Sequence, residues 1–465
     1  MVAGLSNLLN TARDALQVQS YALNVTGQNV ANASTPQYVR REAVIQSTSY
    51  GIAQGSVEVL GVRRAADAYA DQRLFSANAQ SAAASQYDDD LGQIESLFND
   101  VSGTGLGSVL DDLFSSFQNL AASPNDSTVR DQVLQNVDAF TTRAQSVGDA
   151  LATQRQETLA RAQEVAQEVN ARAQEIAKLN QQIVFAQQSG QDASDLVDQR
   201  NVKLLNLSEL VDVRTVPAAD GGIMVQTAGV MLVEGDFART LSVSLDADGK
   251  MAVFASRPGG GQPETNITAQ LTGGQLAGIK EARDNDLFDV SARFDQFIFD
   301  VATAINDQHQ LGVGLDGVGL RNIFDVGPTS EDAARLIRVS ADVAGHPEAL
   351  AAASTADALP GGSDNALLLG NLLSSVVMTG GRTPAQAYGD LVGDVGTRRA
   401  SSRADVELRL SVVQQAQTAR DSTSGVSLDD EMVAIERYQR AYQAASRLLT
   451  VVDDLLSDLM SRVGR

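Results

Sequence analysis

The last long stretch of the chain, residues 427–463, reads SLDDEMVAIERYQRAYQAASRLLTVVDDLLSDLMSRV. Its apolar side chains return at every seventh position in two interleaved rows. The first row consists of Leu428, Ile435, Tyr442, Leu449, Leu456 and Val463, and the second of Tyr438, Ala445, Val452 and Leu459. Only Glu431 breaks the second row. This is the a/d pattern of a coiled coil, and it predicts a long helix whose apolar face needs a partner.

The opposite end of the chain supplies that partner. The same sevenfold spacing runs through Val2, Leu9, Leu16, Leu23 and Val30, with Leu5, Ala12 and Ala22 beside it. We expect the two helices to close the chain on itself as a coiled coil. Pairing within one copy and pairing between copies are both open at this stage. A seam of this kind indicates assembly rather than catalysis.

Composition narrows the class of protein further. The 465 residues carry a net charge of -23 and include no cysteine. The acidic surplus excludes nucleic acid and anionic membranes as partners, because both require basic surfaces. The missing cysteine excludes disulfides and thiolate metal sites. The N-terminal residues lack a signal-peptide pattern, and no stretch reaches the roughly 20 apolar residues of a membrane span. If the protein is exported, we expect a route that leaves its N-terminus uncleaved.

Between the two ends the periodicity changes several times. The sequence predicts extended chain over 38–62 and a small antiparallel β module over 211–274. Helical periodicity predicts helices over 5–32, 65–98, around 110–120, from Ser127 to about 189, and over 192–210, 276–311, 366–375 and 383–422. The predicted fold class is mainly α, with a terminal-helix coiled coil, an elongated helical-bundle body and an inserted antiparallel β domain. The expected domains are 1–35 with 427–465 (coiled coil), 36–210 with 275–426 (body) and 211–274 (β-rich outer domain).

Residues that could carry chemistry are scarce. The two histidines, His309 and His346, are too few for the usual zinc site. Residues 312–317 fit a GxGxxG pattern, but they follow a predicted helix instead of a strand, so we expect a turn. The acidic run 88–90 is expected on a solvated helix face. We therefore expect no enzyme activity, no cofactor and no metal.

Several motifs resemble one known family. Residues 29–40 read NVANASTPQYVR, which is similar to the N-terminal signature of bacterial rod, hook and junction proteins. The signature positions are Asn29, Asn32, Thr35, Tyr38 and Arg40. Relatives usually carry glycine before the tyrosine, so Gln37 predicts a turn that is formed differently.

Internal motifs are more specific than this signature. Similar family segments are Phe117–Leu120 with Pro124, Asn125 and Arg130, Leu179–Ile183, Asp195–Arg200 (which contains Asp198, Gln199 and Arg200), Ile305 and Asn306 with Gln308, His309 and Gly312, and Ser427–Glu431 with Gln439, Ala441 and Tyr442. With these the chain resembles, over nearly its whole length, the flagellar hook-associated protein 1 family of hook–filament junction proteins.

The resemblance implies a structural subunit of the bacterial flagellum that joins hook to filament. It implies terminal helices that form an inner tube, with the β module facing outward. The implied partners are further copies in a ring or helical layer, the hook protein, the second junction protein, and a cytosolic export chaperone on the C-terminal helix. The implied location is extracellular, at the hook–filament junction. Alternatives are another axial flagellar protein, such as the second junction protein or a flagellin, or an adhesin or enzyme displayed through the β module.

Overall fold

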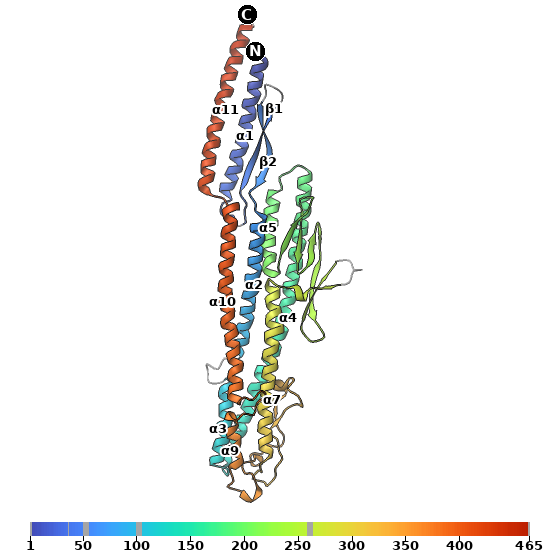
Figure 1. Cartoon of the computed structure of the whole chain (residues 1–465), viewed down its shortest axis with the longest axis vertical. Coiled ribbons are helices and arrows are strands. Elements are labelled where there is room, and N and C mark those ends of the chain that lie inside the picture. Colours follow the sequence, from blue (N-terminus) through green and yellow to red (C-terminus); the bar gives the residue numbers. More distant parts are fainter. Residues whose placement is uncertain (1, 36, 50–54, 99–104, 258–263, 464–465) are drawn as a thin grey trace.

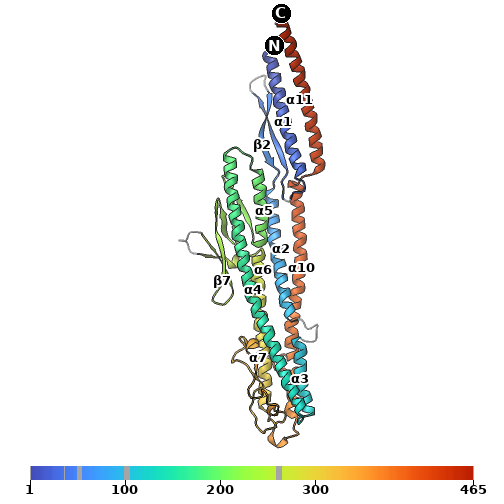
Figure 2. The same cartoon turned by 180° about the vertical axis from the view of Figure 1, so that it is seen from behind.

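The structure is a computed structural model that describes residues 2–35, 37–49, 55–98, 105–257 and 264–463. The described elements follow one another along a single long axis and form a narrow rod (Figure 1). Both termini lie at the same end of this rod. The small β region projects from one side of its middle (Figures 1 and 2). Helices dominate and the sheets are small and antiparallel, which confirms the predicted mainly α fold class.

The end that carries the termini is built by three segments. Helices α1 (Val2–Ala31) and α11 (Leu428–Val463) lie side by side, as the heptads predict. The extended stretch forms an antiparallel hairpin of β1 (Arg41–Ser49) and β2 (Gly55–Arg64). This hairpin runs along the side of α1 that faces away from α11 (Figures 1 and 2). Helix α1 therefore stands between its partner helix and the hairpin.

Long helices form the middle of the rod. Helices α2 (Ala68–Leu97) and α10 (Pro384–Ser424) run side by side, and α10 leads directly into α11. Helix α4 (Ser127–Gln188) is 62 residues long. Helix α5 (Ser194–Leu210) turns back along it, as the sequence predicts.

Helices α4 and α11 each start with a side-chain cap. The Asp126 carboxylate accepts a hydrogen bond of 2.8 Å from the Thr128 backbone N–H at the start of α4. The Ser427 hydroxyl accepts one of 3.3 Å from the Asp430 N–H at the start of α11. Each bond satisfies a backbone donor that the first turn of a helix leaves unpaired.

The β region follows α5 and packs on the flank of α4. Its strands are β3 (Arg214–Pro217), β4 (Ile223–Thr227), β5 (Val230–Glu234), β6 (Phe237–Ala238), β7 (Thr240–Leu245), β8 (Met251–Ser256) and β9 (Thr265–Asn266). Strands β3–β6 form one antiparallel sheet, and β7–β9 form another. Buried Val225, Leu232 and Val253 share one core with Val169 and Ile176 of α4.

The two ends of this β region meet at Gly274. Its φ is +79°, and a Cβ there would lie 2.3 Å from the backbone nitrogen of Val211. Only glycine tolerates both the left-handed conformation and this close approach. The meeting of the two ends supports the predicted insertion of residues 211–274, although the division into three domains stays a prediction.

The helix expected over 276–311 is one continuous rod with an irregular middle. Helix α6 (Gln275–Glu281) passes through a π-helical turn, Ala282–Leu287, into α7 (Phe288–Gln310). Within the turn, Asp284 accepts hydrogen bonds from the Met251 N–H, the longer at 3.1 Å. The π turn thereby ties the helical body to the β7–β8 hairpin, a feature that apolar periodicity does not reveal.

The far end of the rod holds the larger apolar core. Helices α3 (Leu106–Ala122) and α9 (Asp364–Asn371), with α8 (Ala333–Leu336) and the short pair β10 (Phe324–Asp325) and β11 (Arg338–Val339), pack around α4 and α7. Buried aromatic side chains fill this core: Phe114, Phe117, Phe140, Phe294, Phe297 and Phe324.

Residues 312–317 form the predicted turn, in which the Gly317 N–H donates to the Gly314 carbonyl at 3.0 Å.

The expectation of a solvated acidic run at 88–90 is wrong for two of its residues. Asp88 pairs with Arg399, and Asp90, only 2% exposed, pairs with Arg161. These carboxylates link neighbouring helices of the body instead of facing water.

Candidate functional site

Glu431 is the centre of the contact between the two ends of the chain. Its side chain is buried between α11 and α1, with 1% of the residue exposed. One carboxylate oxygen accepts a hydrogen bond of 3.0 Å from the Asn29 side-chain amide, and the other accepts one of 2.6 Å from the Arg40 Nε. This charged pairing raises the pKa of Arg40. The apparent defect in the heptad is thus a polar anchor in an apolar seam.

Asn29 uses its whole amide to fix the chain that leaves α1. Its Nδ2 donates to the Arg41 carbonyl at 2.8 Å as well as to Glu431. Its Oδ1 accepts from the Arg41 N–H and from the Tyr38 hydroxyl, both at 3.0 Å. All four hydrogen-bonding positions of the side chain are therefore occupied, which a carboxylate or an apolar side chain would not reproduce.

The turn before Tyr38 has the conformation that glycine favours. Gln37 has a φ of +63°, in the left-handed region. Glutamine adopts this conformation under strain, and a difference from relatives in how the turn is formed stays a prediction. The Gln37 carbonyl accepts a hydrogen bond of 3.2 Å from Arg420 of α10, and the Arg40 N–H donates to the Ser424 carbonyl at 2.9 Å. The turn thus also holds the end of α10.

A second set of charges joins the hairpin to α5. Arg41, with only 6% of its side chain exposed, donates to Asp195 at 2.6 Å and to Asp198 at 2.9 Å. Arg64 of β2 donates to the same Asp198 through Nε at 3.1 Å. Asp198 is therefore shared by two arginines from the two strands of the hairpin, and it connects the terminal helices to the body.

The motif around residue 200 continues this connection to the β region. The Arg200 Nη1 donates to the Asn180 Oδ1 at 2.9 Å, and burial lowers the pKa of Arg200 to about 10. The Asn180 Nδ2 donates to the carbonyls of Ile223 at 2.8 Å and Gly235 at 3.0 Å. The family-like segments at 179–183 and 195–200 therefore meet in space. We call the whole network, from Glu431 through Asn29, Arg41 and Asp198 to Asn180, the joint.

The remaining signature residues lie outside the joint. Asn32 donates to the Gln28 carbonyl at 2.9 Å and, through its Oδ1, accepts from the Thr35 hydroxyl at 3.3 Å, so both finish helix α1. Gln199 is exposed. The joint residues that the sequence alone did not single out for this role are Glu431, Arg41 and Asn180. The sequence signal for Glu431 was a carboxylate within an apolar heptad row of the C-terminal helix. The same chain carries two consecutive arginines, Arg40 and Arg41, after its N-terminal helix.

The predicted seam residues fall into two groups in a single chain. Leu9, Leu16, Leu23, Val30, Ile435, Leu449 and Leu456 are half-buried. Leu428 and Tyr442 are 53% and 41% exposed, and the side chain of Val463 lies outside the described residues. The buried apolar positions among the described residues are instead Ala12, Val18, Ala22 and Val25 of α1 and Ala445 and Val452 of α11. The role of the ten predicted residues in contacts between copies stays a prediction.

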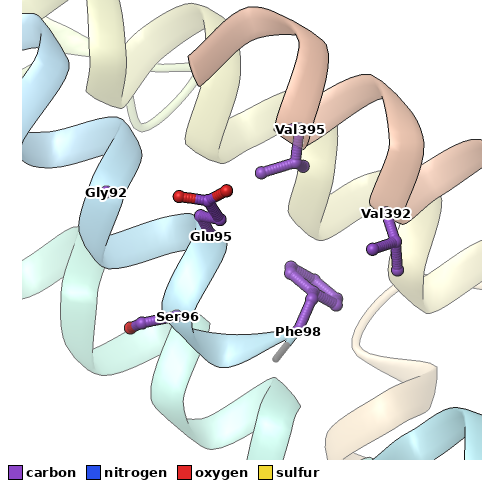
Figure 3. A pocket seen from close by; sticks show the side chains of 7 residues that line it. Gly92, Glu95, Ser96, Phe98, Val392 and Val395 are labelled. Carbon is purple, nitrogen blue, oxygen red and sulfur yellow. The ribbon is translucent and has the colours of Figure 1, made fainter. Parts of the chain in front are cut away.

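A groove and the buried histidine lie outside the joint. A groove of about 480 Å³ lies between the end of α2 and α10, where Phe98, Val392 and Val395 approach the carboxylate of Glu95 (Figure 3). His309 is buried with both ring nitrogens engaged, by the Arg321 carbonyl at 2.8 Å and the Ala351 N–H at 2.9 Å. In the described ranges, no group of three or more His, Asp or Glu side chains is placed to hold a metal. The same ranges contain no helix long and apolar enough for a membrane span.

Both end regions of the chain match known protein families. Residues 9–38 match the family described as flagella basal body rod protein, and residues 417–462 match the C-terminal region of the flagellar basal body rod FlgEFG proteins. These segments contain most of α1 and α11 and the Asn29–Glu431 contact of the joint. They define the class as the flagellar proteins that share the terminal regions of rod and hook subunits.

Residues 91–324, half of the chain, match the helical domain of the flagellar hook-associated protein FlgK. The chain belongs to this family of flagellar hook-associated protein 1. It is therefore a structural protein of the bacterial flagellum.

Individual relatives agree over the full length. Flagellar hook-associated protein 1 of Bacillus subtilis is 25% identical, with 98% of each chain covered. The Salmonella typhimurium protein of that name is 25% identical over 98% of this chain and all of its own. A solved structure of the flagellar hook junction protein FlgK from Burkholderia pseudomallei shares the fold, with a TM-score of 0.68 and 16% identity over 76% of this chain and all of that one.

Proposed function

We propose that this chain joins hook to filament by assembling through its terminal helices after export, and that it has no enzymatic role. The observation that carries the proposal is the joint. Two helices with apolar faces, from opposite ends of one chain, are locked together by the buried Asn29–Glu431 contact. The match to the FlgK helical domain favours the junction protein over another axial protein.

Helix α11 retains apolar surface after it has packed on α1. Leu448, Val451 and Leu455 are each 40% or more exposed. Isolated exposed apolar residues are common, but a row along one terminal helix indicates a contact that a single copy leaves unmade. We propose that neighbouring copies cover this row in a ring or helical layer, with the hook protein on one side and the second junction protein on the other.

Before assembly, the same exposed row favours aggregation. We propose that a cytosolic export chaperone covers α11, and that the chain passes the export channel unfolded with its N-terminus uncleaved. Folding and docking would then follow at the hook tip, where neighbours bury the apolar surface.

Truncation tests the proposal. A chain that ends at Gly425 keeps α10 whole and lacks α11 together with Glu431. We expect it to lose chaperone binding, measured by co-purification from the cytosol, and to leave hooks without filaments. The full chain carrying Glu436→Gln, at an exposed α11 position, is the matched control and should keep both. A truncated chain that still binds the chaperone and still joins hook to filament would rule the proposal out.

A further inference from the structure

The β1–β2 hairpin contains an extra residue at Leu60. Val44 pairs with Gly61 and Ile45 pairs with Val59, so Leu60 has no pairing partner on β1. Such a bulge turns a side chain away from the regular alternation of a strand. Here it leaves Leu60 60% exposed. A large apolar side chain is thus held outward at the end of the rod that forms the terminal contact.

Leu60 forms one wall of a groove beside the joint. The groove has a volume of about 470 Å³ and lies between β2, α1 and the turn from α4 to α5. Tyr21 and Val197 add apolar surface, and Asp192 adds a carboxylate. Exposed Glu58 precedes Leu60 by two positions on the same strand. In the described part of the chain, neither Glu58 nor Asp192 forms an ion pair, so this face presents free negative charge beside an apolar wall.

The exposed stripe of α11 has the complementary character. Its members are Val433, Arg437, Ala444, Leu448, Val451 and Leu455, all exposed. At 3.6 residues per turn, these positions lie within about 60° of one another around the axis of α11. The row that faces α1 lies about 100° away around the same axis. Arg437 stacks on the Tyr438 ring at 4.9 Å and, among the described residues, pairs with no carboxylate. The stripe therefore combines apolar surface with free positive charge.

The groove and the stripe lie on elements that α1 separates, because the hairpin and α11 pack on opposite sides of that helix (Figures 1 and 2). They also stand at similar heights above the Arg40–Glu431 pair. Leu60 lies beside Val44 and Ile45, about 15 Å along the strand from Arg40. The same ~15 Å along α11 from Glu431 reaches the residues around Ala441, in the middle of the stripe.

We propose that the hairpin groove of one copy receives the α11 stripe of the next copy. A contact between two different surfaces is heterologous, and such a contact repeats around a ring or along a helix. Leu60 packs beside Ala444, and Asp192 of the groove lies near Arg437. The proposal rests on the proposed self-assembly and adds the pair of surfaces that meet.

Because the chain contains no cysteine, pairs of introduced cysteines can test this contact directly. The full-length chain carrying Leu60→Cys and Ala444→Cys is produced in cells that lack the native chain, and isolated hook–filament structures are treated with a short bismaleimide. The matched control carries Leu60→Cys and Gln443→Cys, because residue 443 is also exposed but faces about 100° away from residue 444. Electron microscopy with immunogold first establishes that each variant is present at the junction.

We expect a ladder of cross-linked dimers and larger species from the 60/444 pair, and no ladder from the 60/443 pair or from either single variant. A variant that occupies the junction without a 60/444 ladder, or with a stronger 60/443 ladder, contradicts this contact and leaves the proposed function intact. A chain that is absent from the junction contradicts both. As a second readout, Arg437→Glu should weaken filament attachment, and combination with Asp192→Arg should restore it.

Discussion

The side-chain amide of Asn29 donates a hydrogen bond of 3.0 Å to the carboxylate of Glu431, across 402 residues of sequence. Both groups are buried, and the bond stands where α1 ends and α11 begins. One polar contact therefore sets the register of the two terminal helices against each other. The same amide holds β1, so the helices and the hairpin are positioned together.

Glu431→Ala should loosen both terminal helices. The substitution leaves an Asn29 N–H and the Arg40 Nε–H without the carboxylate that accepts from them, and an unsatisfied buried group costs about 1–3 kcal/mol. Hydrogen–deuterium exchange of the amides in α1 and α11 should become faster, while exchange in α4 stays unchanged. Glu436→Ala removes only an exposed ion pair and should change exchange little. Equal exchange in the two variants would contradict the anchoring role of Glu431.

Gln37→Gly should stabilise the turn between α1 and β1. Glutamine at a φ of +63° carries a backbone strain of about 1 kcal/mol that glycine avoids. Urea unfolding followed at the terminal helices should therefore show a higher midpoint. Gln17→Gly, an exposed site inside α1, is the control and should lower the midpoint, because glycine weakens a helix interior. A lower midpoint for the Gln37 variant would show that the turn is unstrained.

The sequence predicted the helices because their apolar periodicity extends over many turns. The alternating apolar residues of the strands were an equally local signal. Local patterns also revealed the pairing partners α1 and α11, since both carry the same sevenfold repeat. The role of Glu431 escaped because a heptad pattern treats a carboxylate as a defect, and only the fold shows that Asn29 and Arg40 reach it.

Other contacts of the joint also form between residues that are distant in sequence and meet only in the folded chain. Asp198 lies 134 positions from Arg64 in sequence, and nothing local to either residue indicates their pairing. The π turn at 282–287 is also invisible to apolar spacing, because Asp284 and Asp286 are buried through partners on other elements. Resemblance marked 195–200 as a motif but did not assign its contacts.

His309 should make the far end of the rod sensitive to acid. Burial lowers its pKa to about 4, from a usual 6.5, so the folded chain favours the neutral ring. The resulting stabilisation is fully present above pH 6.5 and is lost as the pH falls from 6.5 through 4. The pKa difference corresponds to about 3 kcal/mol.

The measurement for His309 is the free energy of unfolding of the native chain and of His309→Gln between pH 7 and pH 4. We expect the native chain to lose stability more steeply than the variant over this range. His346→Gln, at an exposed histidine, serves as the control and should follow the native chain. Parallel curves for the native chain and His309→Gln would refute the assignment.

Asn180→Ala should detach the β region from α4 and α5. The amide makes hydrogen bonds to Arg200, Ile223 and Gly235, and its loss leaves several buried groups unpaired at about 1–3 kcal/mol each. The midpoint temperature of thermal unfolding should fall, and amide hydrogen exchange should accelerate most at residues 223–235. Gln181→Ala, the exposed neighbour, should do neither. Unchanged exchange at 223–235 would show that the β region is held by its apolar core alone.

Electron microscopy of cells that lack this chain tests the central claim most directly. We expect hooks without filaments and flagellin released into the medium, with filaments restored by the full-length chain. Filaments that remain attached to hooks in the absence of the chain would contradict its assignment as the subunit that joins them.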